Sequence, residues 1–361
     1  MKSVILVALA AALPLLGCHD QAKDAPEAAA PPIVPMGMAS AATLVTTTNT
    51  VEVLTKLHHP REAVLGDNEL LVTDTPGDAP DPDDKIDVLS VPLTVGGTAR
   101  RLYPSQRGAE GLAYAGGRVV WIVGPSDDKK DHAKILTGKA GAAPTTVART
   151  YDLDETTAVS DGTDVFTFGD VKDTKADVLS ADVLRVGANG KASRVAGAGP
   201  RPVRTVMAVN GTQVFWIQDG TVVRAPKAGG DPTPVAKVPG SKIQQLAADD
   251  GAVYWTDSGT GDPTWSGRVK RASLADGKVD TLSDAPSPLA IAVDADTVYW
   301  TSSADAGGRI LAQKKTGGAT FVLATDLRKP RGLAVDGKYV YWVSTGDGSV
   351  CRTEKTPHAK P

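Results

Sequence analysis

The chain has 361 residues, of which 41% are hydrophobic, and its 37 glycines and 25 prolines favour many short strands and turns over long helices. Its formal net charge is −3, so it lacks the basic excess of nucleic-acid-binding proteins, and we expect no nucleic-acid partner. Histidines number only 5, which argues against a histidine-based metal or catalytic site.

The N-terminus has the features of a secretory signal. Lys2 precedes an apolar run over residues 4–16, which is shorter than the roughly 20 residues that a membrane-spanning helix needs. The segment Leu15-Leu16-Gly17-Cys18 resembles the lipobox of bacterial lipoproteins. This resemblance implies a lipoprotein signal peptide over residues 1–17 and lipidation of Cys18. The alternative is an ordinary signal peptide with an incidental cysteine.

A lipid anchor would place the protein in the bacterial cell envelope. His19 follows Cys18, whereas some lipoproteins carry an Asp there as an inner-membrane retention signal, so we expect the outer membrane. Residues 18–42 are rich in Ala, Pro and charge, and such a composition predicts a disordered tether. The folded domain is therefore expected over residues 43–356. Its single cysteine, Cys351, lies in a predicted strand and is expected to be a small buried side chain.

A short apolar and aromatic segment recurs along the rest of the chain. Its clearest copy is Ala252–Asp257, which reads Ala-Val-Tyr-Trp-Thr-Asp and suits a buried strand. Counted at the tryptophan or its equivalent, the copies fall at residues 72, 121, 167, 216, 255, 300 and 342. A strand-built repeat of roughly 40–50 residues is typical of a β-propeller, with one repeat per blade.

Each repeat contains four strand-like segments separated by Asp-Gly, Asn-Gly or Gly-Gly turns, which close hairpins. The last repeat lacks its fourth segment. Residues 51–61 match residues 321–331, which contain the fourth strand of the sixth repeat. We therefore predict an all-β fold: a seven-bladed β-propeller of four-stranded antiparallel blades, closed by an N-terminal strand that pairs with the last blade.

The fifth repeat carries a family resemblance. Tyr254-Trp255-Thr256-Asp257, followed by Gly267-Arg268-Val269 and Asp276-Gly277, resembles the YWTD repeat, also called the LDL-receptor class B repeat. The match covers about residues 51–354, although domains of that family usually have six blades. The family consists mainly of protein-binding platforms, so the resemblance implies binding more than catalysis.

The start of the first strand in each repeat is expected to line the mouth of the central channel. Trp265, in the loop 257–267, is a further candidate, because a loop aromatic can anchor a partner or can fold over its own blade. Three of the mouth acids, Glu62, Glu110 and Glu155, suggest a Ca²⁺ site, and the alternative is that they pair with arginines or solvent. The candidate ligand-binding residues of the mouth are Arg61, Glu62, Glu110, Glu155, Arg204, Gln244 and Arg331.

These observations favour a binding or scaffold module that docks a protein or a polysaccharide of the cell envelope, rather than an enzyme. We assign no catalytic residue, because the sequence contains no nucleophile elbow, phosphate-binding loop or Cys-x-x-Cys pair. One alternative is a metal-dependent lactonase-like or lyase-like propeller enzyme with its site in the channel. Another is a structural surface protein without a small ligand. The identity of the ligand and of any metal is left open.

Overall fold

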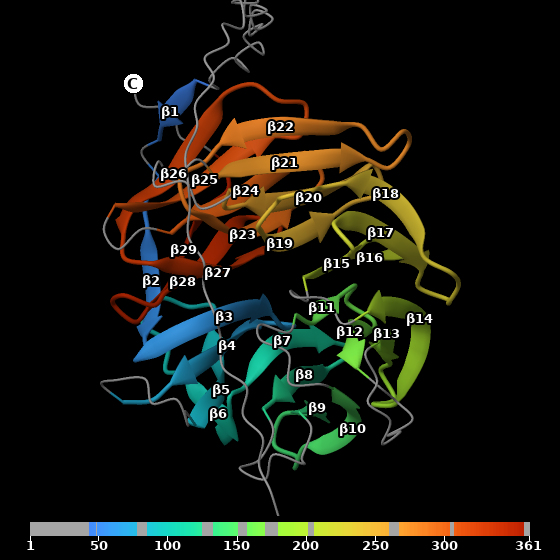
Figure 1. The fold of residues 1–361 in the computed structure, drawn as a ribbon. Helices are drawn as coiled ribbons and strands as arrows, with labels where there is room; N and C mark the ends of the chain where they lie inside the picture. Colours follow the sequence, from blue (N-terminus) through green and yellow to red (C-terminus); the bar gives the residue numbers. More distant parts are fainter. Residues whose placement is uncertain are drawn as a thin grey trace, which may run out of the picture. The chain divides into compact units, whose positions relative to one another are not determined.

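The structure, a computed structural model, divides the chain into two compact units, Met1–Met38 and Ala39–Pro361. It describes residues 43–47, 49–77, 85–124, 133–150, 157–169, 180–200, 206–259, 267–303 and 307–356, all in the second unit. In these ranges the regular structure consists of β-strands (Figure 1). Within them, no helix is long and apolar enough to cross a membrane.

The strands of the second unit form seven sheets arranged as a ring, which confirms the predicted seven-bladed propeller (Figure 1). Blade 1 comprises β3 (His59–Leu65), β4 (Glu69–Thr75), β5 (Lys85–Pro92) and β6 (Arg100–Arg107). Blade 2 comprises β7 (Glu110–Ala115), β8 (Arg118–Val123), β9 (Ala133–Gly138) and β10 (Thr145–Thr150). Blade 3 comprises β11 (Val159–Ser160), β12 (Val165–Gly169), β13 (Ser180–Val186) and β14 (Ala192–Pro200). Blade 4 comprises β15 (Met207–Val209), β16 (Gln213–Gln218), β17 (Thr221–Pro226) and β18 (Thr233–Lys237). Blade 5 comprises β19 (Ile243–Ala248), β20 (Ala252–Asp257), β21 (Arg268–Ser273) and β22 (Val279–Asp284). Blade 6 comprises β23 (Pro288–Val293), β24 (Thr297–Ser302), β25 (Gly308–Lys314), β26 (Thr320–Leu327) and β1 (Leu44–Thr46). Blade 7 comprises β27 (Pro330–Val335), β28 (Tyr339–Ser344), β29 (Ser349–Glu354) and β2 (Glu52–Lys56).

The turn between the first two strands of a blade is closed by its aspartate or asparagine. In blade 5, the carboxylate of Asp249 accepts the backbone N–H groups of Gly251 and Ala252, each at 2.8 Å. This side chain therefore satisfies two turn amides, which is why Asp and Asn recur at this position.

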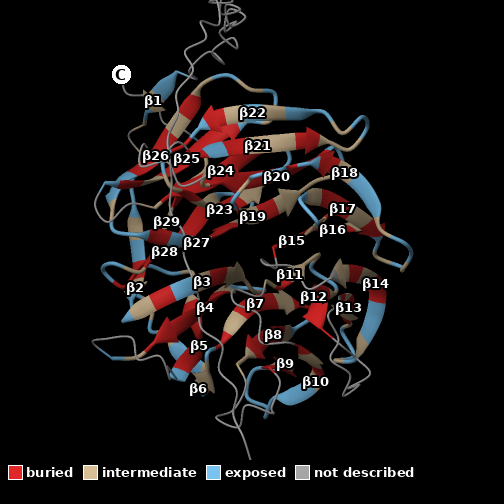
Figure 2. Ribbon diagram, viewed as in Figure 1, coloured by how far each residue is buried: buried red, intermediate tan, exposed pale blue. Residues whose placement is uncertain are grey.

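The second strand of each blade supplies the packing between blades. The five repeated tryptophans are fully buried, as predicted. Tyr254 of blade 5 packs in one apolar cluster with Trp300 of blade 6, and Tyr299 of blade 6 packs in another with Trp342 of blade 7. Figure 2 shows buried residues concentrated on the middle strands, and exposed residues on outer strands such as β18. Each seam between neighbouring blades is thus an apolar layer.

The N-terminal strand closes the ring as predicted. β2 pairs antiparallel with β29, with Val53 opposite Cys351 and Lys56 opposite Ser349. Leu54 has no exposed surface and packs in the cluster shared by blades 7 and 1. β2 thus completes the sheet that the chain's last strands leave unfinished, and no unpaired edge of β29 is exposed.

β1 was not predicted. It pairs in parallel with β26, with Leu44 opposite Thr320 and Thr46 opposite Val322, and it forms a fifth strand on the outer edge of blade 6. Asn49, between β1 and β2, donates to the carbonyl of Glu354 at 2.8 Å. The segment from β1 to β2 therefore spans blades 6 and 7 along their outer edges.

Candidate functional site

Inner strands of the propeller carry an extra residue at an equivalent place. In β3, Pro60 pairs with Asp74 and Glu62 with Thr73, so Arg61 is additional. The same register shift occurs in β7, β19, β23 and β27. Such a bulge changes the direction of the local side chains. In each of these strands, one residue faces the tryptophan position of the second strand, and we call the two residues before it the first and second bulge residues. The first bulge residues are Arg61, Glu110, Gln244, Leu289 and Arg331. The second bulge residues are Glu62, Gly111, Gln245, Ala290 and Gly332.

The first bulge residues meet at the central channel, which is a cavity of about 920 Å³. Thr157 of blade 3 and Ala208 of blade 4 also line this cavity, so every blade contributes to its wall. The structure therefore brings together the described candidates from the sequence, which are Arg61, Glu62, Glu110, Gln244 and Arg331. The other candidates, Glu155, Arg204 and Trp265, lie outside the described residues, as does the predicted lipidation site Cys18.

Charge is unevenly distributed around the first bulge residues. Arg331 of blade 7 and Arg61 of blade 1 occupy neighbouring blades, and both are exposed. Glu110 of blade 2 is half-buried, whereas Gln244 and Leu289, of blades 5 and 6, are neutral. Among the described residues, the side chain of Arg331 has no hydrogen-bond or ion-pair partner. Blades 7 and 1 thus form a cationic sector of the mouth.

Gly332, the second bulge residue of β27, allows blades 7 and 1 to approach closely. Its φ is +43°, in the left-handed region that glycine adopts most readily. A Cβ at this position would lie 2.7 Å from the backbone nitrogen of Ala63. The absence of a side chain at Gly332 therefore permits the contact between β27 and β3 that carries Arg331 and Arg61 on adjacent strands.

Glu62, a second bulge residue, is held by the next blade. Its carboxylate accepts the backbone N–H of Gly111 at 3.1 Å and that of Leu112 at 3.4 Å. Gln245 occupies the same position in blade 5, and its Oε1 accepts the backbone N–H of Ile291 in blade 6 at 2.7 Å. Glu62 and Gln245 are thus equivalent inter-blade contacts, and Glu62 and Glu110 do not occupy equivalent bulge positions.

The environment of Glu62 favours its neutral form. Burial of the carboxyl group raises its pKa to about 7, and the hydrogen bonds from Leu112, Gly111 and Thr73 and the charge of Arg61 oppose this only in part. Glu62 therefore titrates near neutral pH, at the seam between blades 1 and 2.

A metal site is not found within the described residues. There, no group of three or more His, Cys, Asp or Glu side chains could hold a metal ion. Glu155, the third of the predicted acids, lies outside these ranges. The calcium site therefore stays a prediction.

Cys351 is buried, as predicted, and is a free thiol. Burial raises the pKa of its thiol to about 11, so the group is protonated at neutral pH. It behaves as a small apolar side chain in the cluster between blades 6 and 7.

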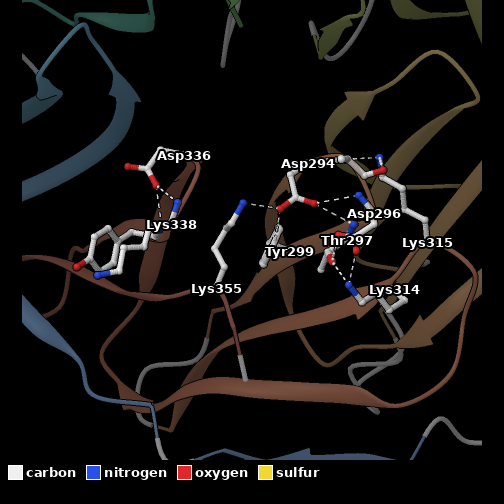
Figure 3. Close-up of polar contacts among 11 residues, drawn as sticks. Asp294, Asp296, Thr297, Tyr299, Lys314, Lys315, Asp336, Lys338 and Lys355 are labelled. Atoms are coloured by element: carbon white, nitrogen blue, oxygen red, sulfur yellow. Dashed lines mark hydrogen bonds and ion pairs between the residues drawn. The ribbon is translucent and has the colours of Figure 1, made fainter. Parts of the chain in front are cut away.

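A second set of polar contacts, which the sequence analysis missed, lies at the other end of the inner strands. There the carboxylate of the turn aspartate in one blade forms an ion pair with the ammonium group of a lysine in the next blade. Figure 3 shows Lys355 of blade 7 directed at Asp294 of blade 6. The Nζ of Lys355 lies 2.7 Å from the Oδ2 of Asp294. The available signal was an aspartate five residues before the tyrosine of the repeat, as in Asp249 and Tyr254. The pairs are Asp161–Lys227 and Asp249–Lys315, each 2.5 Å apart, and Asp294–Lys355.

The contact between blades 5 and 6 borders a cavity of about 600 Å³. Its lining includes Asp249, Tyr254, Arg271, Asp294 and Lys315. Arg271 donates to the carbonyl of Lys315 at 2.5 Å, and Lys315 also donates to the carbonyl of Ala295 at 3.3 Å. Asp249, Arg271, Asp294 and Lys315 therefore have partners within the protein, whereas the exposed Asp250 also lines this cavity.

Comparison with known proteins places the fold and not the function. No protein-family model matches the chain, and no curated protein matches it in sequence. The chain is similar in fold to a catalytically inactive virginiamycin B lyase from Staphylococcus aureus with quinupristin, at 12% identity and a TM-score of 0.57, over 85% of this chain and 100% of that one.

Two other propellers have the same TM-score of 0.57. YCF48 bound to D1 peptide is 9% identical, over 89% of this chain and 100% of that chain. The β-propeller domain of the trilobed protease from Pyrococcus furiosus, described as having an open velcro topology, is 10% identical, over 85% of this chain and 100% of that chain. At such identities the likeness establishes a β-propeller, a fold that hosts both enzymes and binding proteins.

Proposed function

We propose that this chain is a lipid-anchored protein of the bacterial cell envelope whose propeller binds a protein partner at the mouth of the central channel. The observation that carries this proposal is the ring of first bulge residues around one cavity of about 920 Å³. Strands hold these side chains, so they form a preorganised surface, and preorganisation lowers the entropic cost of binding.

The chemistry of the mouth suits a polypeptide partner. Arg331 and Arg61 present guanidinium groups, which bind carboxylates through paired hydrogen bonds and are enriched at protein interfaces. Leu289 adds an apolar contact on the neighbouring blade 6. YCF48, which shares the fold, is bound to D1 peptide, and the YWTD-like repeat also points to a protein-binding platform.

The anchor is part of the same proposal. Residues 1–17 act as a lipoprotein signal peptide, Cys18 carries the lipid, residues 18–42 form a tether, and residues 43–356 form the propeller, which is attached to the outer membrane. The first described residue, Thr43, lies beside β1 on the outer edge of blade 6.

Binding is tested by capture from an envelope extract with the immobilised unit 39–361. We expect the wild-type unit to retain a specific protein, and R331E to lose most of it, because the substitution places a carboxylate in the cationic sector. K237E is the matched control, since Lys237 is an exposed residue of the outer strand β18. Capture of a polysaccharide instead of a protein, or equal capture by R331E and K237E, contradicts the proposal.

Anchoring is tested separately by fractionation of cells that express the full chain. We expect the wild-type protein in the outer-membrane fraction, and C18A outside it, because the acyl chains are the only membrane contact we propose. Membrane association of C18A equal to that of the wild type excludes the lipid anchor.

A further inference from the structure

The aspartate–lysine contacts between blades follow a common geometry. In blade 6, Asp294 Oδ1 accepts the backbone N–H of Thr297 at 3.0 Å, and Oδ2 accepts both the hydroxyl of Tyr299 at 2.9 Å and Nζ of Lys355. In blade 5, Asp249 Oδ2 accepts the hydroxyl of Tyr254 at 3.0 Å together with Lys315. The turn aspartate and its tyrosine thus form a receptor for one ammonium group.

The position that supplies the ammonium can be located in each blade from its backbone hydrogen bond. The backbone N–H of the residue at this position donates to a carbonyl in the same blade, namely that of the residue two places after the turn aspartate or asparagine. The donors so identified are Lys227 to Thr212, Leu274 to Gly251, Lys315 to Asp296 and Lys355 to Lys338. In blade 1, the pairing of Glu69 with Pro92 places Leu93 at this position.

The turn residue of one blade and the lysine position of the next blade match in charge at the seams where both can be identified, except where blade 7 meets blade 1. An aspartate faces a lysine where blade 3 meets blade 4, blade 5 meets blade 6 and blade 6 meets blade 7. Where blade 4 meets blade 5, both members are neutral, since Asn210 replaces the aspartate and Leu274 the lysine. Where blade 7 meets blade 1, the aspartate is present as Asp336 but the lysine position holds Leu93.

Asp336 retains the other contacts of the receptor. Its Oδ1 accepts the N–H groups of Lys338 at 2.7 Å and Tyr339 at 2.6 Å, and its Oδ2 accepts the hydroxyl of Tyr341 at 2.7 Å. Burial raises the pKa of Asp336, but these bonds and the positive charge of Lys355 outweigh burial and hold the pKa below its usual value. The group is therefore a carboxylate at neutral pH, and it is half-buried rather than covered.

The cationic side chains near Asp336 form their ion pairs with other acids, and the guanidinium of Arg352 also lies beside Tyr341 and donates to the carbonyl of Leu93 at 2.6 Å. Lys338 pairs with Glu354 at 3.1 Å, Arg352 with Glu52 at 2.6 Å, and Lys355 with Asp294. In Figure 3, Lys355 points toward Asp294, and the side chain of Lys338 runs away from Asp336. Among the described residues, no ion pair found in the structure includes Asp336.

We propose that Asp336 and Tyr341, where blade 7 meets blade 1, form a binding site for a primary ammonium group that a lysine side chain of a protein partner supplies. The site lies at the opposite end of the inner strands from the first bulge residues, where Gly66 and Asp67 also line the channel cavity, and it does not depend on the function proposed above. A compact ammonium with three donors suits this receptor, because the equivalent aspartate–tyrosine receptors of blades 5 and 6 each hold one. Lys315 also donates to backbone carbonyls of its own turn, and Gly66 and Asp67 supply the corresponding carbonyls in blade 1. The carboxylate of Asp67, which accepts the hydroxyl of Tyr114 at 2.6 Å, adds negative charge beside them.

The test uses the full chain and a lysine analogue, Nα-acetyl-lysine methylamide, as the probe. Titration is followed by nuclear magnetic resonance at the backbone amides of Lys338 and Tyr339, which donate to Asp336. We expect saturable shifts that reach half-maximum at millimolar probe, because one partly exposed ion pair binds weakly. The norleucine analogue, which lacks the ammonium, should leave these signals unchanged.

Two variants and one internal control complete the test. D336N removes the carboxylate, and L93K supplies an internal ammonium, so both should weaken probe binding about tenfold or more. The amides of Asp296 and Thr297, which serve Asp294, should not respond, because Lys355 occupies that receptor. Unchanged binding by D336N, equal binding by the norleucine analogue, or an equal response at Asp294 overturns the proposal.

Discussion

The seam between blades 6 and 7 and the seam between blades 7 and 1 are built from the same repeat but differ in one charge. At the first, Tyr299 packs with Trp342 and Asp294 pairs with Lys355. At the second, Tyr341 packs with Val72, and Asp336 faces a position occupied by Leu93. The apolar layer is common to both seams, whereas the ion pair is not. This difference indicates that apolar packing holds the ring together and that the ion pair is a smaller, dispensable contribution.

The largest expected effect comes from removing the segment that closes the ring. Deletion of residues 43–57 removes β1, β2 and Leu54, and it exposes the edge of β29 and the apolar layer between blades 7 and 1. We expect loss of cooperative thermal unfolding, whereas deletion of residues 19–42 should leave the melting temperature unchanged. Equal melting temperatures for the two deletions would contradict closure by β2.

Truncating the apolar layer comes next. Trp342 is fully buried between blades 6 and 7. W342A should lower the free energy of unfolding by about 3–5 kcal/mol, the usual cost of deleting a large buried aromatic. Urea unfolding measures this value, and a loss below that caused by removing the ion pair of the same seam would refute the dominance of apolar packing.

The seam between blades 1 and 2 should respond to pH. Burial raises the pKa of Glu62 from 4.5 to about 7, so the folded state binds the proton more tightly than the unfolded state does. The stability contributed by this proton is present below about pH 4.5 and falls as pH rises to about 7, by at most about 3 kcal/mol. Urea unfolding at several pH values should show this decline in the wild type and not in E62Q, which places a glutamine where blade 5 has Gln245. A wild type and an E62Q variant with parallel pH profiles would exclude the effect.

Breaking the ion pair between blades 6 and 7 should cost less than truncating the tryptophan. K355L leaves the partly buried carboxylate of Asp294 without its ammonium, and we expect a loss of about 1–3 kcal/mol. The double variant D294N/K355L imitates the neutral seam of Asn210 and Leu274 and should recover part of this loss. Chemical unfolding of the set decides the point, since no recovery in the double variant would show that the receptor geometry is not transferable between seams.

The smallest effect is expected from restoring the missing charge. L93K should add an ammonium opposite Asp336 and raise the free energy of unfolding by about 0.2–1 kcal/mol, the range for a partly exposed ion pair. The gain should disappear in L93K/D336N. A gain that persists in the double variant would show that it does not come from this ion pair.

The architecture could be predicted because its signals are local and repeated. Each copy of the Val-Tyr-Trp-Thr pattern marks one second strand, and the match of residues 51–61 to 321–331 identified the closing strand. β1 escaped prediction because three residues, Leu-Val-Thr, hold too little pattern to indicate a strand, and nothing in them indicates parallel pairing with β26.

The candidate site could be predicted only to its neighbourhood. The described mouth residues do line the channel, because the start of the first strand is easily recognised. The bulge adds one residue at the start of that strand. Glu110 is therefore a first bulge residue and Glu62 a second, although both lie near the start of the first strand of their repeats. The inter-blade ion pairs join residues about one and a half repeats apart, such as Asp294 and Lys355, and no local pattern links their members.

Hydrogen exchange at the amides of β2 tests directly whether the N-terminal strand closes the ring. We predict that β2 amides exchange as slowly as those of β29, through unfolding of the whole propeller, while the short outer strand β1 exchanges faster. Exchange of β2 at the rate of unstructured chain, with β29 still protected, would contradict closure of the ring by the N-terminal strand.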